Sequence, residues 1–469
     1  MRGVVVLFIL MMGLFTGRAE SKNGHGKLLK EFLENNTSVV TARSRKKLAA
    51  LSYQMLGASK TFFFAFEKAK VTDRSDNLTY GSKAYNSTSN SHSWTLSKDF
   101  LFGTTLSYKK SKTDYYLDSA KKSRYEYGTT LTISQNLGQD FFGISHRKAL
   151  ESASYHAKGV QALSKDQVER LLIHFYSTFV SIRIQKTMVS LSNETLKRAK
   201  RRTSLIRKRV RDGIRRKVDL YQAQMLEMKS LEDLKNAKMV LDDSLAQMSD
   251  LLGRKVLGKE VDDLAFRRLP SLRTASRANS YELLAKKMEL EKAKRDLDKS
   301  MYAMLPVIKL TGSYRYNDWD YDKAMARGKG GYGENQKKTT VAITASWPLL
   351  LAPQRVDLQM KKVSKMVAQR QLHAMENKFD NISESLLRQI NLLEKNIGLS
   401  KKRQVLARKA VSEYNRLYKI GKAALDNVIQ AEEDLSSSAK IYFGNLQKRE
   451  LMRASFEQLN GNLKNYLIQ

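Results

Sequence analysis

Two stretches of the chain place apolar residues at spacings of three and four over long distances. Residues 146–212 and residues 354–420 each contain no proline and a single glycine. Apolar positions at these spacings fall on one face of an α-helix, so each stretch predicts a helix of about 67 residues and about 100 Å. Shorter helices are predicted to run back from them over residues 215–252 and 422–460. Amphipathic helices of this length need neighbours along the apolar stripe, and coiled-coil packing supplies them.

Alternation of apolar and polar residues, which is typical of β-strands, marks the segments before the long helices. The predicted strands are residues 61–71, 127–137, 307–316 and 340–347, with an extra pair at 94–102 and 104–116. Each has about the length of a tilted membrane strand. Surface loops are predicted at residues 77–93, which are rich in serine and asparagine, and at residues 318–336, which are rich in glycine and charge.

The two halves of the chain follow the same order of elements: helix, strands, long helix, glycine reversal and shorter helix. Three residues of the first half have an identical residue 208 positions later in the second half. The pairs are Gly213 and Gly421, Ala223 and Ala431, and Gly253 and Gly461. A fixed offset of this kind predicts two structural repeats. The predicted division is a signal peptide at 1–19, a first repeat at 20–253, a connector at 254–280 and a second repeat at 281–469.

The N-terminus has the three parts of a secretory signal peptide. Arg2 is the positive residue, residues 4–16 are an apolar run, and Gly17 and Ala19 are small residues at the −3 and −1 positions of a cleavage site. We therefore expect residues 1–19 to be removed and the mature chain to be exported. No later run reaches 18 consecutive apolar residues, so no transmembrane helix is expected.

The composition removes several classes of function. The 469 residues include no cysteine, which excludes disulfides, thiolate metal sites and cysteine nucleophiles. The six histidines lack metal-ligand spacing, and no phosphate-loop or nucleophile motif is present, so we expect neither catalysis nor a cofactor. The net charge of +37 favours nucleic acid or an anionic membrane as a partner.

One pattern occurs twice: a glycine, then an Asp-aliphatic-x-x-Ala segment, then a helix ending in Leu-x-Gly. The residues that carry it are Gly213, Asp219 and Ala223 in the first half and Gly421, Asn427 and Ala431 in the second. With a Leu-Pro before one strand at 305–306 and a Trp-Pro after another at 347–348, the chain resembles the TolC-like outer-membrane efflux proteins over residues 28–465. Asn427 departs from the family pattern, which has aspartate there.

The resemblance implies a mixed α+β membrane protein of two structural repeats. Three copies would share one transmembrane β-barrel, continued by a long periplasmic α-helical barrel. Four strands from each of three chains would make 12. The extra pair would either raise that number or stand above the membrane.

The resemblance further implies a location in the outer membrane of a Gram-negative bacterium, extending into the periplasm. The function would be a passive exit duct of a tripartite efflux or type I secretion system, gated at its periplasmic tip. The six pattern residues would lie at this tip and dock a periplasmic adaptor (membrane fusion protein). The further partners would be an inner-membrane transporter of RND or ABC type and outer-membrane lipid, with no nucleic acid expected.

Basic residues cluster on both sides of the two reversal glycines. Residues 197–217 hold 12 Lys and Arg with one acid, and residues 401–422 hold eight with one acid. Three interpretations are open: a solvated helix face, a positive pore mouth that attracts anions, and a docking surface for an acidic partner. The candidate mouth residues are Arg207, Arg209, Arg211, Arg215, Arg216, Arg416, Lys419 and Lys422.

Aromatic residues gather in or beside the predicted strands. A membrane-interface girdle accounts for them, and the alternative is the core of a soluble β-sandwich. The candidate girdle residues are Phe62, Phe64, Trp94, Tyr314, Tyr316 and Trp347.

Two other classes of protein compete with the exit duct. A secreted basic coiled-coil protein that binds nucleic acid or another polyanion explains the charge, but not the strands or the repeat. A trimeric adhesin with a helical stalk explains strands and long helices, but not two strand sets that each feed a helix pair. Extraction separates the first alternative, because a membrane protein needs detergent whereas a polyanion binder is released by salt.

Overall fold

The computed structural model describes residues 24–58, 60–73, 87–117, 122–261, 275–327, 336–347 and 351–468. The chain divides into two compact units, and each takes segments from both halves of the sequence. The helical unit comprises Met1–Arg45, Ala162–Leu284 and Met375–Gln469, and the sheet unit comprises Lys46–Gln161 and Ala285–Ala374. The predicted signal peptide lies outside the described residues.

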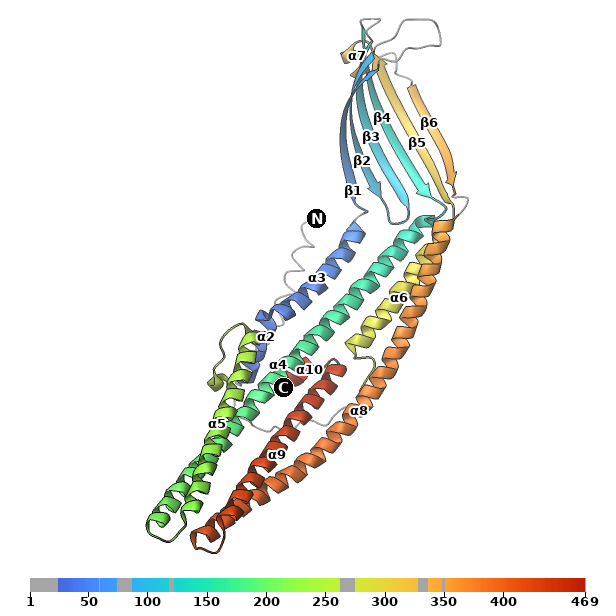
Figure 1. Cartoon of the computed structure of the whole chain (residues 1–469). Coiled ribbons are helices and arrows are strands. Elements are labelled where there is room, and N and C mark those ends of the chain that lie inside the picture. Colours follow the sequence, from blue (N-terminus) through green and yellow to red (C-terminus); the bar gives the residue numbers. More distant parts are fainter. Residues whose placement is uncertain are drawn as a thin grey trace. The chain divides into compact units, whose positions relative to one another are not determined.

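The sheet unit is built around one six-stranded antiparallel sheet. Its strands lie in chain order, and Figure 1 shows them side by side. They are β1 (Phe62–Asp73), β2 (Ser87–Asp99), β3 (Thr104–Leu117), β4 (Lys122–Asn136), β5 (Val307–Asp320) and β6 (Gln336–Ser346). The extra strand pair predicted from the sequence is therefore part of the sheet, between β1 and β4.

Two predicted loops contain regular structure. The loop predicted at 77–93 is wrong from Ser87 onward, because β2 begins there and pairs with β1 from Ser87 to Lys98. The loop predicted at 318–336 is wrong at both ends, where β5 continues to Asp320 and β6 begins at Gln336, and a short helix, α7 (Lys323–Arg327), lies between them. Serine and asparagine are typical of loops, yet a strand with one wet face also accepts them.

Four helices supply the remainder of the sheet unit. They are the second part of α3 (Thr37–Ala58), the start of α4 (Ile144–Arg211), most of α6 (Tyr281–Tyr302) and the start of α8 (Ala352–Lys419). Hydroxyl–carboxylate hydrogen bonds of 2.6 Å join α4 to α6 through Ser152 and Asp296, and α6 to α8 through Ser300 and Asp357. Pro306 lies between the end of α6 and the first residue of β5. Its fixed φ and missing N–H suit a change from helix to strand.

The helical unit contains the ends of α4 and α8 and the helices that return from them. The returning helices are α5 (Lys217–Leu252) and α9 (Leu425–Leu459). The unit also contains α2 (Gly24–Asn35), the start of α3, the short 3₁₀ helix η2 (Gly258–Glu260) and α10 (Leu463–Ile468). Each long helix begins and ends within three residues of the range predicted from periodicity.

An aromatic cluster forms the main core of the helical unit. Phe32 of α2 stacks on Phe175 of α4 with ring centroids 4.9 Å apart, and Phe179 continues the stack one turn later. Met248 of α5 and Leu463 of α10 close the cluster, and all five side chains are buried. Among the described residues, no helix has both the length and the apolar character needed to cross a membrane.

Candidate functional site

One face of the sheet carries large apolar side chains that are exposed to solvent. The strand register places Phe64, Leu96, Leu131 and Tyr314 in a single row across the sheet. We call this face the apolar face; its exposed members are Phe62, Phe64, Phe66, Trp94, Leu96, Leu106, Leu131, Ile133, Tyr314, Val341 and Ile343. Soluble proteins bury such residues, so a continuous exposed band marks a contact with another apolar phase or partner.

The length of this band along a strand fits a membrane. Along β5 the apolar face runs from Ile308 to Tyr316, and eight steps of about 3.3 Å make about 26 Å along the strand. A membrane strand tilted by about 45° needs about 9–11 residues to cross the apolar layer, and this stretch is about nine residues long. The band therefore has the dimension that a bilayer requires.

The opposite face carries hydroxyl groups, and we call it the hydroxyl face. The row next to Phe64 begins with the exposed Phe63 and continues with Ser97, Ser107, Thr132, Ser313 and Thr340. Ser93 and Ser134 on this face are 8% and 5% exposed. Because successive side chains of a strand point to opposite faces, the sheet has one apolar face and one face rich in hydroxyl groups.

The six aromatic residues of the candidate girdle are placed as follows. Five lie on the apolar face: Phe62, Phe64, Trp94, Tyr314 and Tyr316. Trp347 follows β6, is 57% exposed, and donates its indole N–H to the carbonyl oxygen of Met304 at 3.3 Å. The structure thus brings five of them together on one surface, while their contact with a membrane stays a prediction.

The sheet has two open edges among the described residues. β1 and β6 each pair on one side only, and every side chain of β6 is exposed. Because four strands lie between them in an antiparallel sheet, the two edge strands run in opposite directions. An edge of unpaired backbone groups is a template for another strand.

The turns at Gly213 and Gly421 have the same local geometry. Their φ angles are 72° and 78°, and each turn closes with a backbone hydrogen bond, Ile214 N–H to Arg209 at 2.8 Å and Lys422 N–H to Leu417 at 2.9 Å. None of the described residues lies within 4 Å of a Cβ added at either glycine. The glycine is required by the left-handed backbone of a helix C-cap rather than by crowding.

Four helices meet beside these turns. Ile206 of α4, Ala223 of α5, Tyr418 of α8 and Val428 of α9 form one buried cluster. Ala223 and the equivalent Ala431 are 2% and 5% exposed, so both pattern alanines are packing residues. Asp219 is half-buried beside Arg215 at 3.8 Å.

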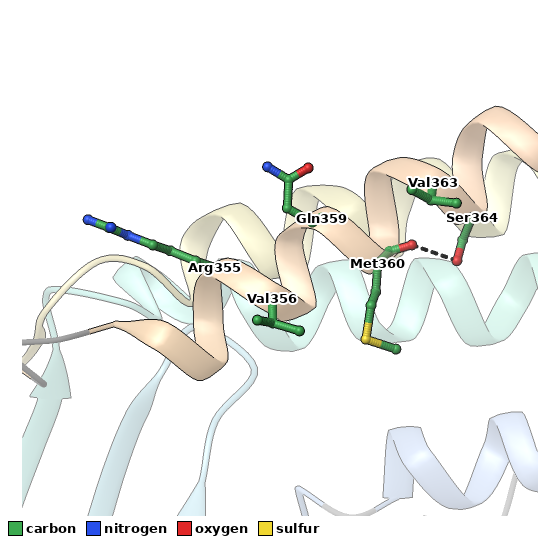
Figure 2. A pocket seen from close by; sticks show the side chains of 6 residues that line it. All are labelled: Arg355, Val356, Gln359, Met360, Val363 and Ser364. Carbon is green, nitrogen blue, oxygen red and sulfur yellow. Dashed lines mark hydrogen bonds between the residues drawn. The ribbon is translucent and has the colours of Figure 1, made fainter.

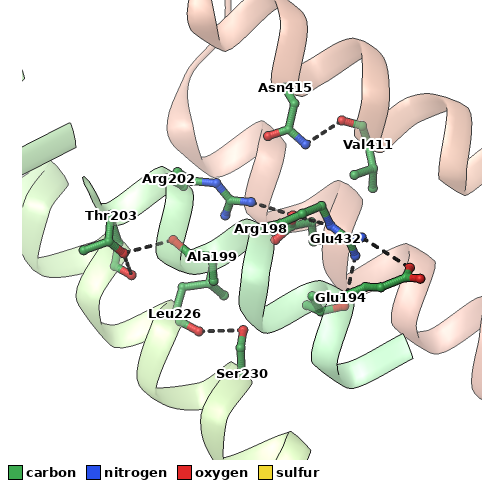
Figure 3. Close-up of polar contacts among 12 residues, drawn as sticks. Glu194, Arg198, Ala199, Arg202, Thr203, Leu226, Ser230, Val411, Asn415 and Glu432 are labelled. Carbon is green, nitrogen blue, oxygen red and sulfur yellow. Dashed lines mark hydrogen bonds and ion pairs between the residues drawn. The ribbon is translucent and has the colours of Figure 1, made fainter. Parts of the chain in front are cut away.

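A buried ion pair joins the two helix hairpins near this cluster, and Figure 3 shows it. The Arg202 guanidinium of α4 donates to the Glu432 carboxylate of α9 at 2.5 Å, and Arg198 approaches the same oxygen at 3.5 Å. The side chains of Arg202 and Glu432 are only 5% and 4% exposed. A second pair between the hairpins, Lys229 with Glu433 at 2.7 Å, is exposed to solvent.

The candidate mouth residues divide into two groups. Arg209 donates to the carbonyl oxygen of Lys419 at 2.7 Å, Arg215 lies over the Tyr418 ring at 5.2 Å, and Arg416 pairs with Glu413 at 2.5 Å. The guanidinium of Arg416 beside it lowers the pKa of the Glu413 carboxyl. Arg211 lies 3.8 Å from Asp212, whereas the side chains of Arg207, Arg216, Lys419 and Lys422 are exposed and make no ion pair with the described residues.

Exposed apolar residues also recur on two helices at heptad spacing. On α5 they are Val218, Tyr221, Met225 and Met228, and on α8 they are Leu392, Leu399 and Leu406. In the sheet unit, Figure 2 shows Val356, Met360 and Val363 at the start of α8, which line a shallow hollow and are also exposed. Spacings of three, four and seven form one helix stripe, which is the seam of a coiled coil.

Sequence reasoning missed three features of these surfaces. The hydroxyl face was hidden because Ser-rich β2 resembles a loop. Glu432 was passed over, although it lies one helical turn after Val428 in an apolar stripe and a lone acid there signals a buried partner. The third is Glu169, a buried carboxylate of α4 that accepts the backbone N–H of Leu463 at 3.0 Å.

No protein-family model and no curated protein matches this chain. Solved structures match over nearly its whole length. The outer membrane protein VceC from Vibrio cholerae is 13% identical with a TM-score of 0.69, covering 93% of this chain and 96% of VceC. The open state of the MtrE outer membrane channel from Neisseria gonorrhoeae is 17% identical with a TM-score of 0.68, covering 95% and 90%.

The CmeC outer membrane channel from Campylobacter jejuni is 11% identical with a TM-score of 0.68, covering 94% of this chain and 86% of CmeC. The chain has the fold of these outer-membrane channels. The TolC-like fold expected from the repeated glycine pattern is therefore confirmed. Among the described residues, no group of three or more His, Asp or Glu is arranged to hold a metal ion.

Proposed function

We propose that this protein is an exit duct in the outer membrane of a Gram-negative bacterium, extending into the periplasm as part of a tripartite efflux or type I secretion system. One observation carries the proposal: a sheet with an apolar face about 26 Å long along its strands and a hydroxyl face behind it, in a chain with the fold of outer-membrane channels. The apolar face meets lipid, and the hydroxyl face lines a water-filled passage. The protein moves no electrons or protons of its own and performs no catalysis.

The open edges of the sheet support a homotrimer with a shared barrel. Backbone groups cannot stay unpaired in lipid, so the edges must close. β6 of one copy and β1 of the next run in opposite directions and can pair as antiparallel strands. Three copies of the six-stranded sheet give 18 strands, which is the alternative in which the extra pair raises the number above 12.

The exposed heptad stripes support a helical tube made by the same three copies. The stripe of Met225 and Met228 on α5 and the stripe of Leu399 and Leu406 on α8 are exposed in the part of the chain that the structure describes. Each meets a neighbouring copy as a coiled-coil seam. The two structural repeats, with equal turns at Gly213 and Gly421, supply equivalent hairpins to this tube.

The helix turns form the periplasmic tip and its gate. The buried pair of Arg202 and Glu432 holds the two hairpins of each copy together, so separating them requires breaking it. At the tip, a periplasmic adaptor (membrane fusion protein) docks on the turns, and an inner-membrane transporter of RND or ABC type supplies the energy. Of the six pattern residues, Gly213, Asp219, Gly421 and Asn427 form the docking surface, whereas the buried Ala223 and Ala431 pack the hairpins beneath it.

The unpaired cations at the turns support an anion-favouring mouth. Arg216 and Lys422 are exposed beside the two reversal glycines, and three copies place six such charges around one opening. A ring of positive charge attracts anions and repels cations.

Extraction and conductance test the proposal together. The duct requires detergent for extraction and forms ion-conducting channels in planar bilayers, with reversal potentials that show anion selectivity across a salt gradient. Arg216→Glu with Lys422→Glu shifts the selectivity toward cations, whereas the control, Lys440→Glu with Lys448→Glu on α9, leaves it near the original value. Release by salt without detergent would overturn the duct in favour of a polyanion-binding coiled coil.

A further inference from the structure

The apolar face of the sheet ends in lysines on the side away from the helices. β1 leaves α3 at Phe62, and after three exposed phenylalanines its next two positions on the same face are Lys68 and Lys70. The register puts Lys110 of β3 and Lys337 of β6 in the row of Phe66, Trp94 and Tyr316. We call Lys68, Lys70, Lys110 and Lys337 the lysine rim.

None of the acids that the structure describes in this region forms an ion pair with a rim lysine. Asp114 pairs with Lys112 at 2.7 Å, so that lysine is left out of the rim. Asp318 and Asp320 lie on the same face but are buried, at 6% and 8% exposure. Within the part of the sheet that the structure describes, the four rim lysines are exposed and make no ion pair.

The rim continues the apolar face without a break. Lys110 of β3 lies directly opposite Trp94 of β2. Along β3 it follows Tyr108, the previous residue on the same face. A molecule that packs acyl chains on the leucines and phenylalanines therefore places its head beside ammonium groups. Lysine stems can cover apolar surface while their charged ends reach the polar layer.

We propose that the lysine rim binds the phosphate groups of anionic lipids in the outer leaflet of the membrane. The inference rests on the proposed function, because it takes the apolar face to be the lipid-facing one. Charge complementarity and continuity with the apolar band identify the ligand: a phosphorylated head attached to acyl chains. Ammonium groups near an anionic membrane surface attract it at about a fivefold gain in binding for each lysine.

Closure of the sheet would concentrate the rim at the boundary between copies. Lys337 lies on one edge strand, and Lys68 and Lys70 lie on the other, all on the apolar face. Neighbouring strands are about 4.8 Å apart, and Lys68 and Lys70 are about 6.6 Å apart along one strand. A single phosphate can therefore contact lysines from two copies.

The chain offers a matched control for this site. Lys109 and Lys338 are exposed and lie one residue from Lys110 and Lys337, on the same strands but on the hydroxyl face. Lys110→Gln with Lys337→Gln is the rim variant, and Lys109→Gln with Lys338→Gln is the control. Both remove two charges from each copy.

The experiment is native mass spectrometry of the detergent-extracted full-length protein titrated with diphosphorylated lipid A. We expect the rim variant to bind lipid A about 25-fold more weakly and the control to bind it like the original. Equal effects of the two variants, or no effect of the rim variant, would overturn the proposal. Displacement of lipid A by millimolar inorganic phosphate, or equal retention of zwitterionic phosphatidylcholine, would also overturn it.

The result is separable from the proposed function. Both variants are checked for detergent-dependent extraction, oligomer size and conductance in planar bilayers. A rim that fails to bind lipid in a protein that still conducts refutes only this inference. A protein that neither needs detergent nor conducts refutes the duct itself.

Discussion

Replacing Glu432 with alanine is expected to open the contact between the two helix hairpins. The change leaves the Arg202 guanidinium, whose side chain is 5% exposed, without its partner carboxylate. Breaking a buried ion pair on one side costs about 3–5 kcal/mol, because an uncompensated charge remains in a dry site. The adjacent Glu433→Ala is the control, since its pair with Lys229 is exposed and worth about 0–1 kcal/mol.

Amide hydrogen exchange on peptides from the ends of α4 and α9 measures this local opening. At about 1.4 kcal/mol for each tenfold change, Glu432→Ala speeds exchange there by roughly two to three and a half orders of magnitude, and Glu433→Ala by less than about tenfold. Combining Arg202→Met with Glu432→Leu restores most of the protection, because a hydrophobic pair needs no desolvation of charge. Equal exchange in the two single variants would refute the reasoning.

Three further predictions concern a carboxyl group, a turn and the two sheet faces. Burial raises the pKa of Glu169 to about 7, so the folded state holds this proton more tightly than the unfolded state and the free energy of unfolding falls as pH rises from 4.5 toward 7. Glu169→Gln should remove a fall of about 3 kcal/mol from the profile of unfolding free energy against pH. Parallel profiles for the variant and the original protein would contradict this. Gly213→Ala should lower stability by about 1–2 kcal/mol, because Gly213 has a left-handed backbone. Gly398→Ala, inside α8, should raise stability by up to about 1 kcal/mol. Thermal melting of the helices measures both, and shifts of the same sign would contradict the turn geometry. Val341→Arg on the apolar face should lower stability by about 2–4 kcal/mol and deplete the protein from the membrane fraction. Ala342→Arg on the hydroxyl face should have neither effect. A larger effect of Ala342→Arg would mean that the hydroxyl face is the one that meets lipid.

Apolar periodicity made the helices predictable. The pattern predicted one long helix at residues 146–212, and the structure has a helix at Ile144–Arg211. The agreement is close because apolar spacing and a glycine C-cap are both local signals. The reversal glycines were predictable for the same reason: a φ near 70° is a local requirement, met at Gly213 by the residue type itself.

The position of the extra strands could not be predicted from local pattern. Residues 94–116 alternate as strands do, but alternation does not say which strands pair. The pairing of β2 with β1 depends on contacts along 12 residue pairs, and the serine-rich start of β2 becomes a strand only because β1 and β3 lie on either side of it. The six-stranded sheet follows from this tertiary context.

The buried pair at the tip was beyond local reasoning as well. Arg202 and Glu432 are 230 residues apart in sequence. Arg202 sits among 12 basic residues that all look alike in sequence, and only the packing of four helices shows which one is buried. Charge clusters predict a partner or a pore, but not which members already have a partner within the chain.

Single-particle imaging of the detergent-extracted protein tests the central claim most directly. We expect a hollow particle with threefold symmetry, in which β6 of each copy pairs with β1 of the next and 18 strands enclose the hydroxyl face. A monomer, a filament, or a sheet whose apolar face points inward would contradict it.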